Sequence, residues 1–320
     1  MLMVDMHHIV SDGISHGVLT RDFVAFYRGE ALPPLKIHYR DYCLWSGSRG
    51  QAELAVQEAY WLERFKAGTP LLELPLDFER PPLQGFSGDS LHVRLGIEKT
   101  GALNNMAGER GVTMFMMLLA IYNILLSQLS GQADIVVGTS AAGRRHRDLE
   151  QVIGMFVNAL ALRNFPAGHK TFKEFLAEVK ASTIAAFDNQ DYQFEELVKR
   201  IVPKRIPGRN PVFDVMLVLN NEAAPAAEIP GLRLRYYQYE RNAAQMDLKL
   251  RAVEAAGDLH LTFEYDSQLF RRETVEMLAG NFNGIATAVL ENPDTLLKEI
   301  RLSHGLLSSR KDTSPMAFGF

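Results

Sequence analysis

The spacing of apolar residues along the chain predicts a succession of amphipathic helices. The clearest pattern lies near the end, where Val275, Leu278, Phe282, Ile285 and Val289 recur at intervals of three and four residues. The same periodicity, or a capping residue, predicts further helices earlier in the chain. These cover the segment that follows Gly13 up to about Arg28, residues 52–65, 98–108 and 114–129, and a helix that starts at the capping box of Thr171 and Glu174.

Other segments show the two-residue alternation or the short apolar runs that are typical of strands. Leu259, Leu261, Phe263 and Tyr265 alternate with polar residues, which predicts a half-exposed strand. The run at 134–138 is β-branched and apolar, as in a strand that is covered on both faces. Further strands are predicted at residues 1–9, 91–95, 212–219, 232–239 and 247–253. Strands that are mixed with helices in this way indicate the α/β class.

The composition is that of an ordinary globular protein. The chain has 320 residues, of which 47% are hydrophobic and 22% charged, enough for one large domain or two subdomains. Its net charge of −4 includes no long run of one sign, so neither nucleic acid nor a membrane is indicated as a partner. Cys43 is the single cysteine, which excludes an internal disulfide and fits a reducing, cytoplasmic location. The most apolar run, 114–122, is far shorter than the ~20 residues that span a bilayer.

The segment HHIVSDG carries the strongest candidate chemistry. On a strand, His7 and His8 would point to opposite faces, one into the fold and the other into a cleft. An imidazole exchanges protons near neutral pH, so the histidine in the cleft is a candidate for acid–base chemistry. Asp12 could orient an imidazole or cap the helix that follows, and Gly13 would let a ligand approach the backbone closely. Taken alone, the segment could equally be a strand end with two structural histidines and a turn.

Polar residues also follow two of the predicted strands. Arg144 and Arg145 could pair with an anion, with an interior carboxylate such as Asp12, or with solvent, and composition alone favours solvent. Asn221 comes at the end of the strand at 212–219, where side chains often reach a cleft. The sequence contains neither the glycine-rich loops that bind nucleotides nor the G-x-S-x-G elbow of serine hydrolases. The histidine pair and Asp12 do not make a complete set of metal ligands.

HHIVSDG resembles the HHxxxDG signature of the condensation domains of non-ribosomal peptide synthetases, which belong to the chloramphenicol-acetyltransferase-like superfamily. Four further stretches are similar to elements of that family, in the expected order: YRDYCLW at 39–45, IGMFVNALALR at 153–163, NQDYQFE at 189–195 and RNPVF at 209–213. Cys43, Ala159 and Gln193 stand where the family usually has a small residue, a threonine and a proline. The wording of 153–163 favours condensation over the epimerisation and cyclisation relatives.

The resemblance implies an amide-forming acyltransferase with a chloramphenicol-acetyltransferase-like two-lobed fold and mixed sheets. Such a domain transfers an acyl or peptidyl group from the thioester on one carrier protein to the amine of an aminoacyl thioester on another. It thereby forms a peptide bond in the biosynthesis of antibiotics and other secondary metabolites. The implied partners are the upstream and downstream carrier proteins and an adenylation domain. No directly bound cofactor is implied, because the substrates are carried on phosphopantetheine.

The resemblance also implies roles for the HHxxxDG residues. The second histidine, here His8, faces the cleft in this family and is the catalytic candidate, either as a general base or by positioning the amine. General-base assistance is worth about 10²–10⁴-fold. Asp12 is implied to be structural and to pair with Arg144 or, as the reserve, with Arg145. A buried pair of this kind costs several kcal/mol when one partner is removed.

The remaining candidates support the site or line the cleft. His7 and Gly13 are supporting residues of the motif, and Asn158 and Asn221 are the weaker candidates for the substrate cleft.

The resemblance predicts four parts along the chain: residues 1–67 as the remnant of a first lobe carrying HHxxxDG, 68–89 as a crossing segment, 90–302 as the second lobe, and 303–320 as a flexible tail or linker. Condensation domains have further motifs before HHxxxDG, so the first lobe is expected to be incomplete. Two alternatives to the active acyltransferase therefore remain: a catalytically incompetent fragment that keeps carrier-protein docking, or a stand-alone acyltransferase of the same superfamily. The amino acids that are joined stay open, although the wording of the motif favours an L donor.

Overall fold

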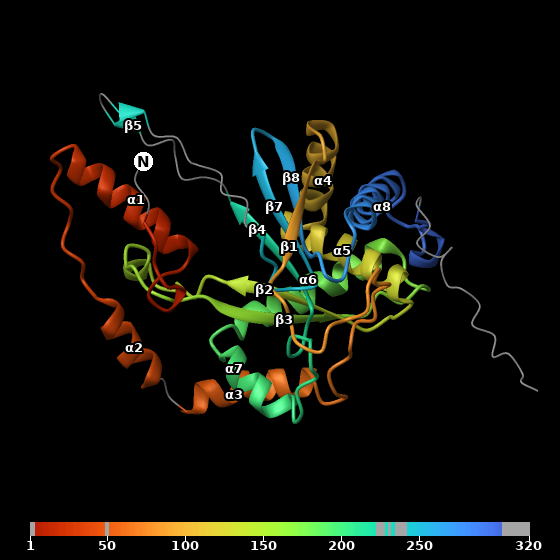
Figure 1. Ribbon diagram of the computed structural model, residues 1–320, viewed down its shortest axis with the longest axis horizontal. Coiled ribbons are helices and arrows are strands. Elements are labelled where there is room, and N and C mark those ends of the chain that lie inside the picture. Colours follow the sequence, from red (N-terminus) through yellow and green to blue (C-terminus); the bar gives the residue numbers. More distant parts are fainter. Residues whose placement is uncertain (1–3, 49–50, 222–227, 230–231, 234–241, 303–320) are drawn as a thin grey trace, which may run out of the picture.

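The computed structural model is organised around one six-stranded mixed sheet (Figure 1). The strand order is β1-β8-β7-β4-β2-β3. The central strands β7, β4 and β2 are parallel, and the other neighbours are antiparallel. The structure describes residues 4–48, 51–221, 228–229, 232–233 and 242–302; within these ranges the side chains of 51, 52, 221, 228, 229, 232 and 233 are not described.

The sheet strands are β1 Gly88–Arg94, β2 Ile135–Ala141, β3 Asn158–Asn164, β4 Val215–Asn221, β7 Leu248–Ala255 and β8 Asp258–Asp266. A separate two-stranded pair is formed by β5 Glu228–Ile229 and β6 Leu232–Arg233. The helices are α1 Gly13–Tyr27, α2 Tyr39–Gly47, α3 Gln51–Arg64, α4 Ile97–Arg110, α5 Met114–Ser130, α6 Phe172–Asp188, α7 Phe194–Ile201 and α8 Arg272–Glu291. Short 3-10 turns occur at η1 His8–Val10, η2 Arg147–Leu149 and η3 Leu297–Glu299.

Local sequence signals account for the helix ends that the pattern predicted. Thr113 caps α5, its hydroxyl accepting a hydrogen bond from the Met116 N–H at 3.3 Å. Thr171 and Glu174 form the predicted capping box at the start of α6. Gly131 ends α5 in the left-handed conformation, which glycine adopts without steric cost. The predicted helices are therefore confirmed, with ends shifted by one or two residues.

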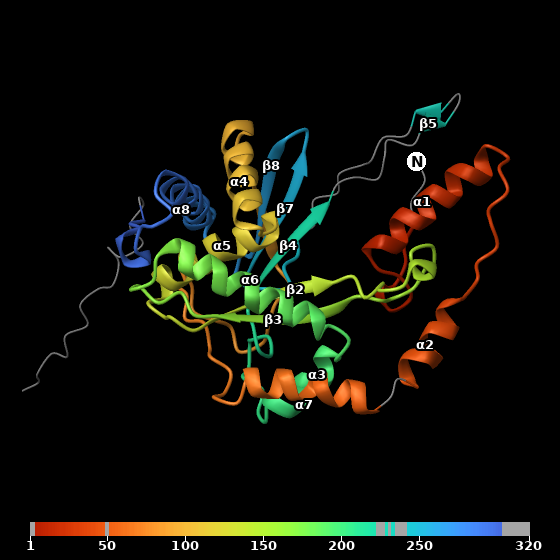
Figure 2. The same cartoon turned by 180° about the vertical axis from the view of Figure 1, so that it is seen from behind.

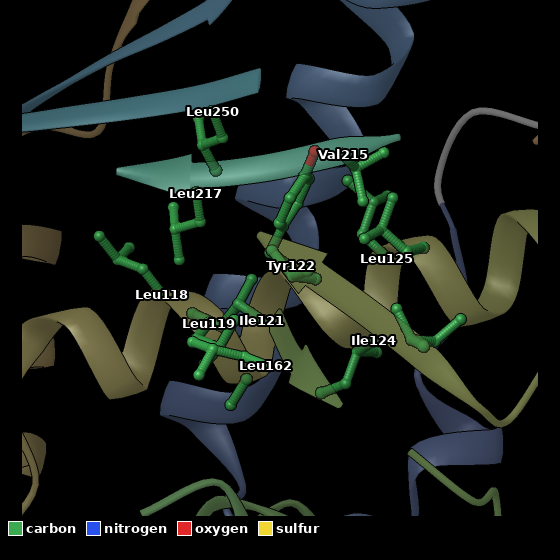
Figure 3. Packing of buried hydrophobic residues seen from close by; sticks show 14 of the residues in the cluster. Leu118, Leu119, Ile121, Tyr122, Ile124, Leu125, Leu162, Val215, Leu217 and Leu250 are labelled. Carbon is green, nitrogen blue, oxygen red and sulfur yellow. The ribbon is translucent and has the colours of Figure 1, made fainter. Parts of the chain in front are cut away.

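Helix α5 forms the centre of the hydrophobic core (Figure 3). Its residues 117–122 all have 0% exposure, so the helix is buried on every side. Around it, Leu162 comes from β3, Val215 and Leu217 from β4, and Leu250 from β7. In the part of the chain that the structure describes, no single helix is long and apolar enough to cross a membrane. The bent pair of α4 and α5 passes that test by length and composition only.

The two halves of the sheet are covered differently. β2 and β3 bury nearly all of their residues, because neighbouring elements pack on both of their faces. β7 and β8 instead bury mainly alternate residues, and Phe263 of β8 packs edge-on against Phe282 of α8. This leaves one face of the β1-β8-β7 half open, as the alternation at 259–265 predicted. Helices α1 and α2 lie apart from the helices that pack on the sheet (Figure 2).

Two strand predictions and the predicted tail require correction or fall outside the described residues. No strand forms in the described part of residues 1–9, where residues 8–10 make the turn η1. A strand needs a neighbouring strand to bind its N–H and C=O groups, and none of the described strands runs beside this segment. The strand predicted at 232–239 is described only at 232–233, and the predicted tail at 303–320 lies outside the described residues.

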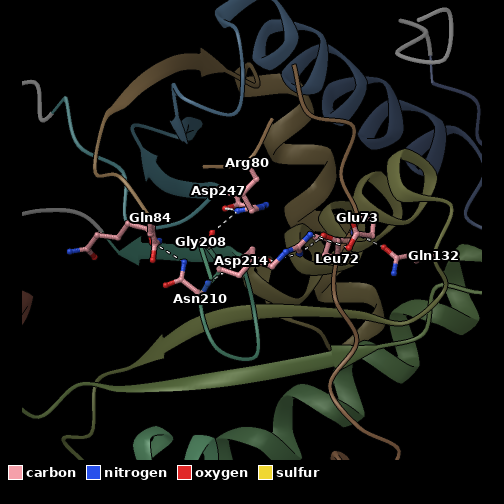
Figure 4. A network of polar contacts seen from close by, with 11 residues as sticks. Leu72, Glu73, Arg80, Gln84, Gln132, Gly208, Asn210, Asp214 and Asp247 are labelled. Atoms are coloured by element: carbon pink, nitrogen blue, oxygen red, sulfur yellow. Dashed lines mark hydrogen bonds and ion pairs between the residues drawn. The ribbon is translucent and has the colours of Figure 1, made fainter. Parts of the chain in front are cut away.

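A network of mostly buried charges, with the exposed Glu73 at its edge, joins the segment between α3 and β1 to the start of β4 and β7 (Figure 4). Arg80 makes a two-point contact with Asp247, and Arg209 donates to Asp214 at 2.9 Å and to Glu73 at 3.0 Å. Burial, and then the negative charge of Asp247, raise the pKa of Asp214 to about 6. The Arg209 and Arg80 charges oppose this rise without cancelling it. The crossing segment is therefore held to the sheet by paired charges.

This raised pKa predicts a pH dependence of stability. Asp214 has a pKa near 3.8 when exposed and about 6 in the folded protein, so it stabilises the fold when protonated and loses that contribution as the pH rises through 6. The difference of about two pKa units corresponds to at most about 3 kcal/mol. We expect the free energy of unfolding of the wild type to fall relative to that of Asp214→Asn between pH 4 and 6.5. Urea unfolding measures this, with the exposed Asp294→Asn as the control; parallel curves for the wild type and Asp214→Asn would contradict the prediction.

Candidate active site

The two histidines of HHIVSDG lie in a turn. His7 precedes η1, and its Nδ1 accepts a hydrogen bond from the Ile9 N–H at 3.1 Å, while the Val10 N–H binds the His7 carbonyl at 3.1 Å. Both imidazoles are exposed, so the prediction that one of them points into the fold is wrong. Alternation of faces applies to a strand, and a 3-10 turn does not follow it. His8 nevertheless borders an open cleft beside the sheet, described below, as expected for the second histidine.

Asp12 caps the helix that follows and forms the ion pair that the resemblance implied, whereas no described hydrogen bond joins its carboxylate to an imidazole. Its Oδ1 accepts from the Ser15 N–H at 2.8 Å, which caps α1. The same carboxylate accepts from Arg144 Nη2 at 3.0 Å and from the Phe156 N–H at 3.2 Å. Burial opposes the charge of Asp12, but the hydrogen bonds of Ser15 and then of Arg144 outweigh it and lower the pKa below its ordinary value of 3.8. Asp12 is therefore a buried carboxylate that stays ionised.

Arg144 is as well enclosed as its partner. The exposure of the side chains is 3% for Arg144 and 0% for Asp12. Arg144 Nη1 donates to the backbone carbonyls of Leu149 and Val152, and the guanidinium lies 4.1 Å from the centre of the Phe156 ring. The predicted ion pair is thus present, and it is made by the first of the two candidate arginines.

Arg145 makes a different contact. Its guanidinium pairs with Asp191 at 2.7 Å, and 47% of its side chain is exposed. Asp191 also receives a hydrogen bond from Gln57 of α3 at 3.3 Å. Gln193, and not Asp191, occupies the position before α7.

Ser15 is a residue of this site that the sequence interpretation missed. Its hydroxyl lies 2.8 Å from Asp12 Oδ1 and 3.0 Å from Arg144 Nη2. It also lies 2.9 Å from the Gly154 carbonyl oxygen and 3.1 Å from the Gly154 nitrogen. The spacing of three residues between Asp12 and Ser15 is that of a cap and the residue it binds, so the sequence did contain this signal. Ser15 connects α1 to the loop at 142–157.

The loop at 142–157 also holds α2. Tyr39 donates its hydroxyl to the Met155 carbonyl at 2.7 Å, and its ring packs edge-on against Phe156. A Cβ at Gly154 would lie 2.2 Å from the Tyr39 ring, so this close approach requires glycine. The YRDYCLW and IGMFVN stretches are therefore parts of one packed unit.

Asn158 does not line the cleft, which corrects the prediction from sequence. It is 6% exposed, and its Nδ2 donates to the carbonyls of Gln190 and Tyr192 at 2.7 and 2.9 Å. Its Oδ1 accepts from the Phe194 N–H at 3.1 Å. These three bonds use both N–H groups and one lone pair of the amide to fix the NQDYQFE turn, and the buried side chain is not among the residues that border the cleft.

Asn221, the other weak candidate for the cleft, ends β4, but its side chain is outside the described residues. Its neighbour Asn220 borders the cleft. The sequence did not indicate two further residues that hold this turn, Gln57 and Trp61 of α3. Both bind the backbone of the NQDYQFE turn, as Asn158 does. A single sequence gives no sign of such contacts across more than 120 residues.

An open cleft of about 2070 Å³ connects the HHIVSDG turn with the sheet. His8, Gly13 and Ile14 border it on one side. Its other walls come from the beginning of α5, the end of α6, and the faces of β2, β4, β7, β8 and β1. His8 is thus an exposed imidazole on a wide cleft, next to a buried ion pair that fixes the turn carrying it.

Comparisons with known proteins identify the family of the chain and its fold. A family model described as the condensation domain matches residues 1–306. Bacitracin synthase 1 of Bacillus licheniformis is 44% identical over 301 residues, which are 94% of this chain and 6% of that protein. Tyrocidine synthase 3 of Brevibacillus parabrevis is also 44% identical, over 94% of this chain and 5% of that protein. The chain thus spans only about a twentieth of the length of these relatives.

Solved structures show the same fold. A four-domain non-ribosomal peptide synthetase bound to AMP and glycine superposes with a TM-score of 0.85 at 22% identity, over 94% of this chain and 24% of that one. The X-domain from teicoplanin biosynthesis gives a TM-score of 0.82 at 25% identity, over 92% of this chain and 70% of that one. These likenesses show the fold of the chain, including the mixed sheet that its sequence predicted.

Proposed function

Because the chain belongs to the condensation-domain family of non-ribosomal peptide synthetases, we propose that it forms peptide bonds by acyl transfer between carrier-bound thioesters. The amine nitrogen of the acceptor attacks the donor thioester carbonyl. The C–N bond forms, the C–S bond breaks, the donor carrier leaves as a thiol, and the amine gives up one proton. The family match over residues 1–306 is the observation that carries this proposal.

The proposed site centres on His8. An exposed imidazole on a wide cleft is available to accept the proton of the attacking amine, or to hold the amine by a hydrogen bond. Asp12 and Arg144 are positioning residues in this proposal, because their contacts hold the start of α1 and the turn next to it. His7 supports the turn through its bond to Ile9, and Gly13 borders the cleft.

The proposed partners follow from the reaction. Upstream and downstream carrier proteins would bring donor and acceptor on phosphopantetheine arms, and an adenylation domain would load the acceptor. We place the chain's functional division where the sequence predicted it, with residues 1–67 carrying the histidine motif and residues 90–302 forming the second lobe. The resolved ion pair between Asp12 and Arg144 would then join the two parts.

A reconstituted transfer assay tests the proposal. We expect residues 1–320 to convert a donor acyl thioester and an acceptor aminoacyl thioester, each on its own carrier, to an amide that mass spectrometry detects on the acceptor carrier. As a control, the acceptor carrier is loaded with an acyl group that lacks both an amine and a hydroxyl. No amide should form with it, because no nucleophile is then present. A folded chain that gives no amide above the enzyme-free rate would favour the incompetent fragment. Equal rates with free small-molecule amines would favour the stand-alone acyltransferase.

A further inference from the structure

The open face of the β1-β8-β7 half of the sheet forms a polar floor in the cleft. The strand register places Arg251 beside Thr262, and Thr262 beside His92. One pair further along, Lys249 lies beside Glu264. Strand alternation sends all of these side chains to the face opposite the core. They are far from the HHIVSDG turn in sequence, and the proposed chemistry at His8 does not use them.

Positive charge exceeds negative charge on this floor. Glu264 is shared by two cations, Lys249 at 3.1 Å and Arg251 at 2.6 Å, so a single carboxylate compensates two positive charges. The Nε of Arg251 is buried and donates to no described atom. The side chains of Lys249 and Arg251 are 32% and 41% exposed, so both ends remain accessible from the cleft.

The other residues that border the cleft do not supply the missing negative charge. Two histidines, His92 and His260, lie on the same face of β1 and β8. Apart from Glu264, the carboxylate among the described lining residues is Asp188, which comes from the end of α6 on another wall. An anion that enters the cleft would therefore meet an excess of one positive charge on Lys249 and Arg251.

We propose that the floor formed by Lys249 and Arg251 binds an oxyanion of a substrate, with Glu264 holding the two cations in place when the site is empty. Guanidinium and ammonium groups favour carboxylate and phosphate oxygens, and a planar Arg fork can bind two of them at once. The identity of the anion as part of a substrate rests on the proposed function; the binding of the anion does not. Two sources share this chemistry: the phosphate of a carrier arm, and a carboxylate on the group that is transferred or accepts it.

Matched pairs of probes separate the two sources. Calorimetric titration of the chain would compare phosphopantetheine with pantetheine, and N-acetylglycine with N-acetylglycinamide, at low ionic strength. We expect the anionic member of at least one pair to bind about fivefold more tightly than its neutral mate, the factor for one unit charge near 4 Å in water. Added salt should reduce this preference. The pair that shows it identifies the source, and equal affinities within both pairs would overturn the proposal.

Three variants test the named residues, two of them expected to lower the preference for the anion and one to raise it. Lys249→Gln and Arg251→Gln should each lower the ratio of the affinities for the anionic and neutral probes by about fivefold, because each takes away one positive charge. Glu264→Gln should increase the preference, because it frees both cations. Lys199→Gln, at an exposed pair with Glu196 on α7, should change nothing. A loss in Glu264→Gln equal to that in the cation variants, with the thermal transition unchanged, would show that the cluster is only structural.

These measurements involve no turnover, so they remain informative if the chain fails to form amides. Binding without amide formation would uphold the anion site and count against the proposed activity of this chain. Amide formation without a preference for either anion would uphold the activity and overturn the anion site.

Discussion

Replacing His8 with alanine is expected to lower the kcat of amide formation by about 10²–10⁴-fold, the range for the loss of a group that transfers a proton. The imidazole is exposed and borders the cleft, so its removal takes away a group that can touch the attacking amine. It breaks no buried contact, and we expect the free energy of unfolding to change by at most about 0.5 kcal/mol. Single-turnover rates with saturating carrier substrates, together with urea unfolding, measure both quantities.

The neighbouring histidine offers the matched control. His7→Asn keeps a side-chain acceptor for the Ile9 N–H, so the turn should persist and most of the rate should be retained. A His7→Asn variant as slow as His8→Ala would show that the rate reports the turn and not one imidazole. His8→Asn distinguishes the two possible roles of His8, because asparagine can hold an amine by a hydrogen bond but is no base near neutral pH. Equal rates in the wild type and His8→Ala would contradict the assignment of His8.

The sequence predicted the second half of the chain best, because its signals there are local. The stripe of α8 and the capping box of α6 depend on residues within one or two turns of each other. The alternation at 259–265 likewise correctly predicted that β8 has one buried and one open face. In each of these elements, tertiary packing and local preference agree, so the pattern alone was sufficient.

Residues 4–27 show where local patterns fail. The apolar run before His7 is compatible with a strand, but a strand also needs a partner, and the described sheet does not supply one at this place. The apolar periodicity after Gly13 correctly predicted α1, yet Phe26 is 65% exposed, so this periodicity does not mark a buried stripe in the described chain. The periodicity of apolar residues thus predicts that a helix forms, but it does not predict which part of the protein packs against the apolar face of that helix.

The candidate site could be predicted only as far as the family resemblance extended. The pairing of Asp12 with Arg144 joins residues 132 positions apart; composition alone favoured solvent as the partner of the arginine, and the resemblance favoured Asp12. Asn158 belongs to an equally suggestive stretch, but its amide is used up by the backbone of the NQDYQFE turn. A side chain in a signature stretch can thus serve packing or chemistry, and the choice depends on which polar groups the fold leaves unpaired.

The ion pair between Asp12 and Arg144 should be the most sensitive point for stability. Removing the charge of one partner leaves the other buried and uncompensated, which costs about 3–5 kcal/mol. Asp12→Asn is the informative change, because asparagine can still cap α1 at the Ser15 N–H and so isolates the loss of charge. Arg144→Met is the corresponding change in the partner. We expect both to lower the free energy of unfolding, and to reduce kcat because the turn that carries His8 is no longer fixed.

The double variant decides whether Asp12 acts by position or by chemistry. Asp12→Asn with Arg144→Met buries no net charge, so its loss of stability should be smaller than the sum of the single losses, by about 1–3 kcal/mol. If Asp12 only positions the turn, the double variant should also be faster than Arg144→Met alone. Arg145→Met is the matched control: this arginine is 47% exposed, so loss of its pair with Asp191 should cost less than loss of the fully buried pair between Asp12 and Arg144. An Asp12→Asn variant that is as stable as the wild type, yet inactive whether or not Arg144 is replaced, would instead place Asp12 in the chemistry.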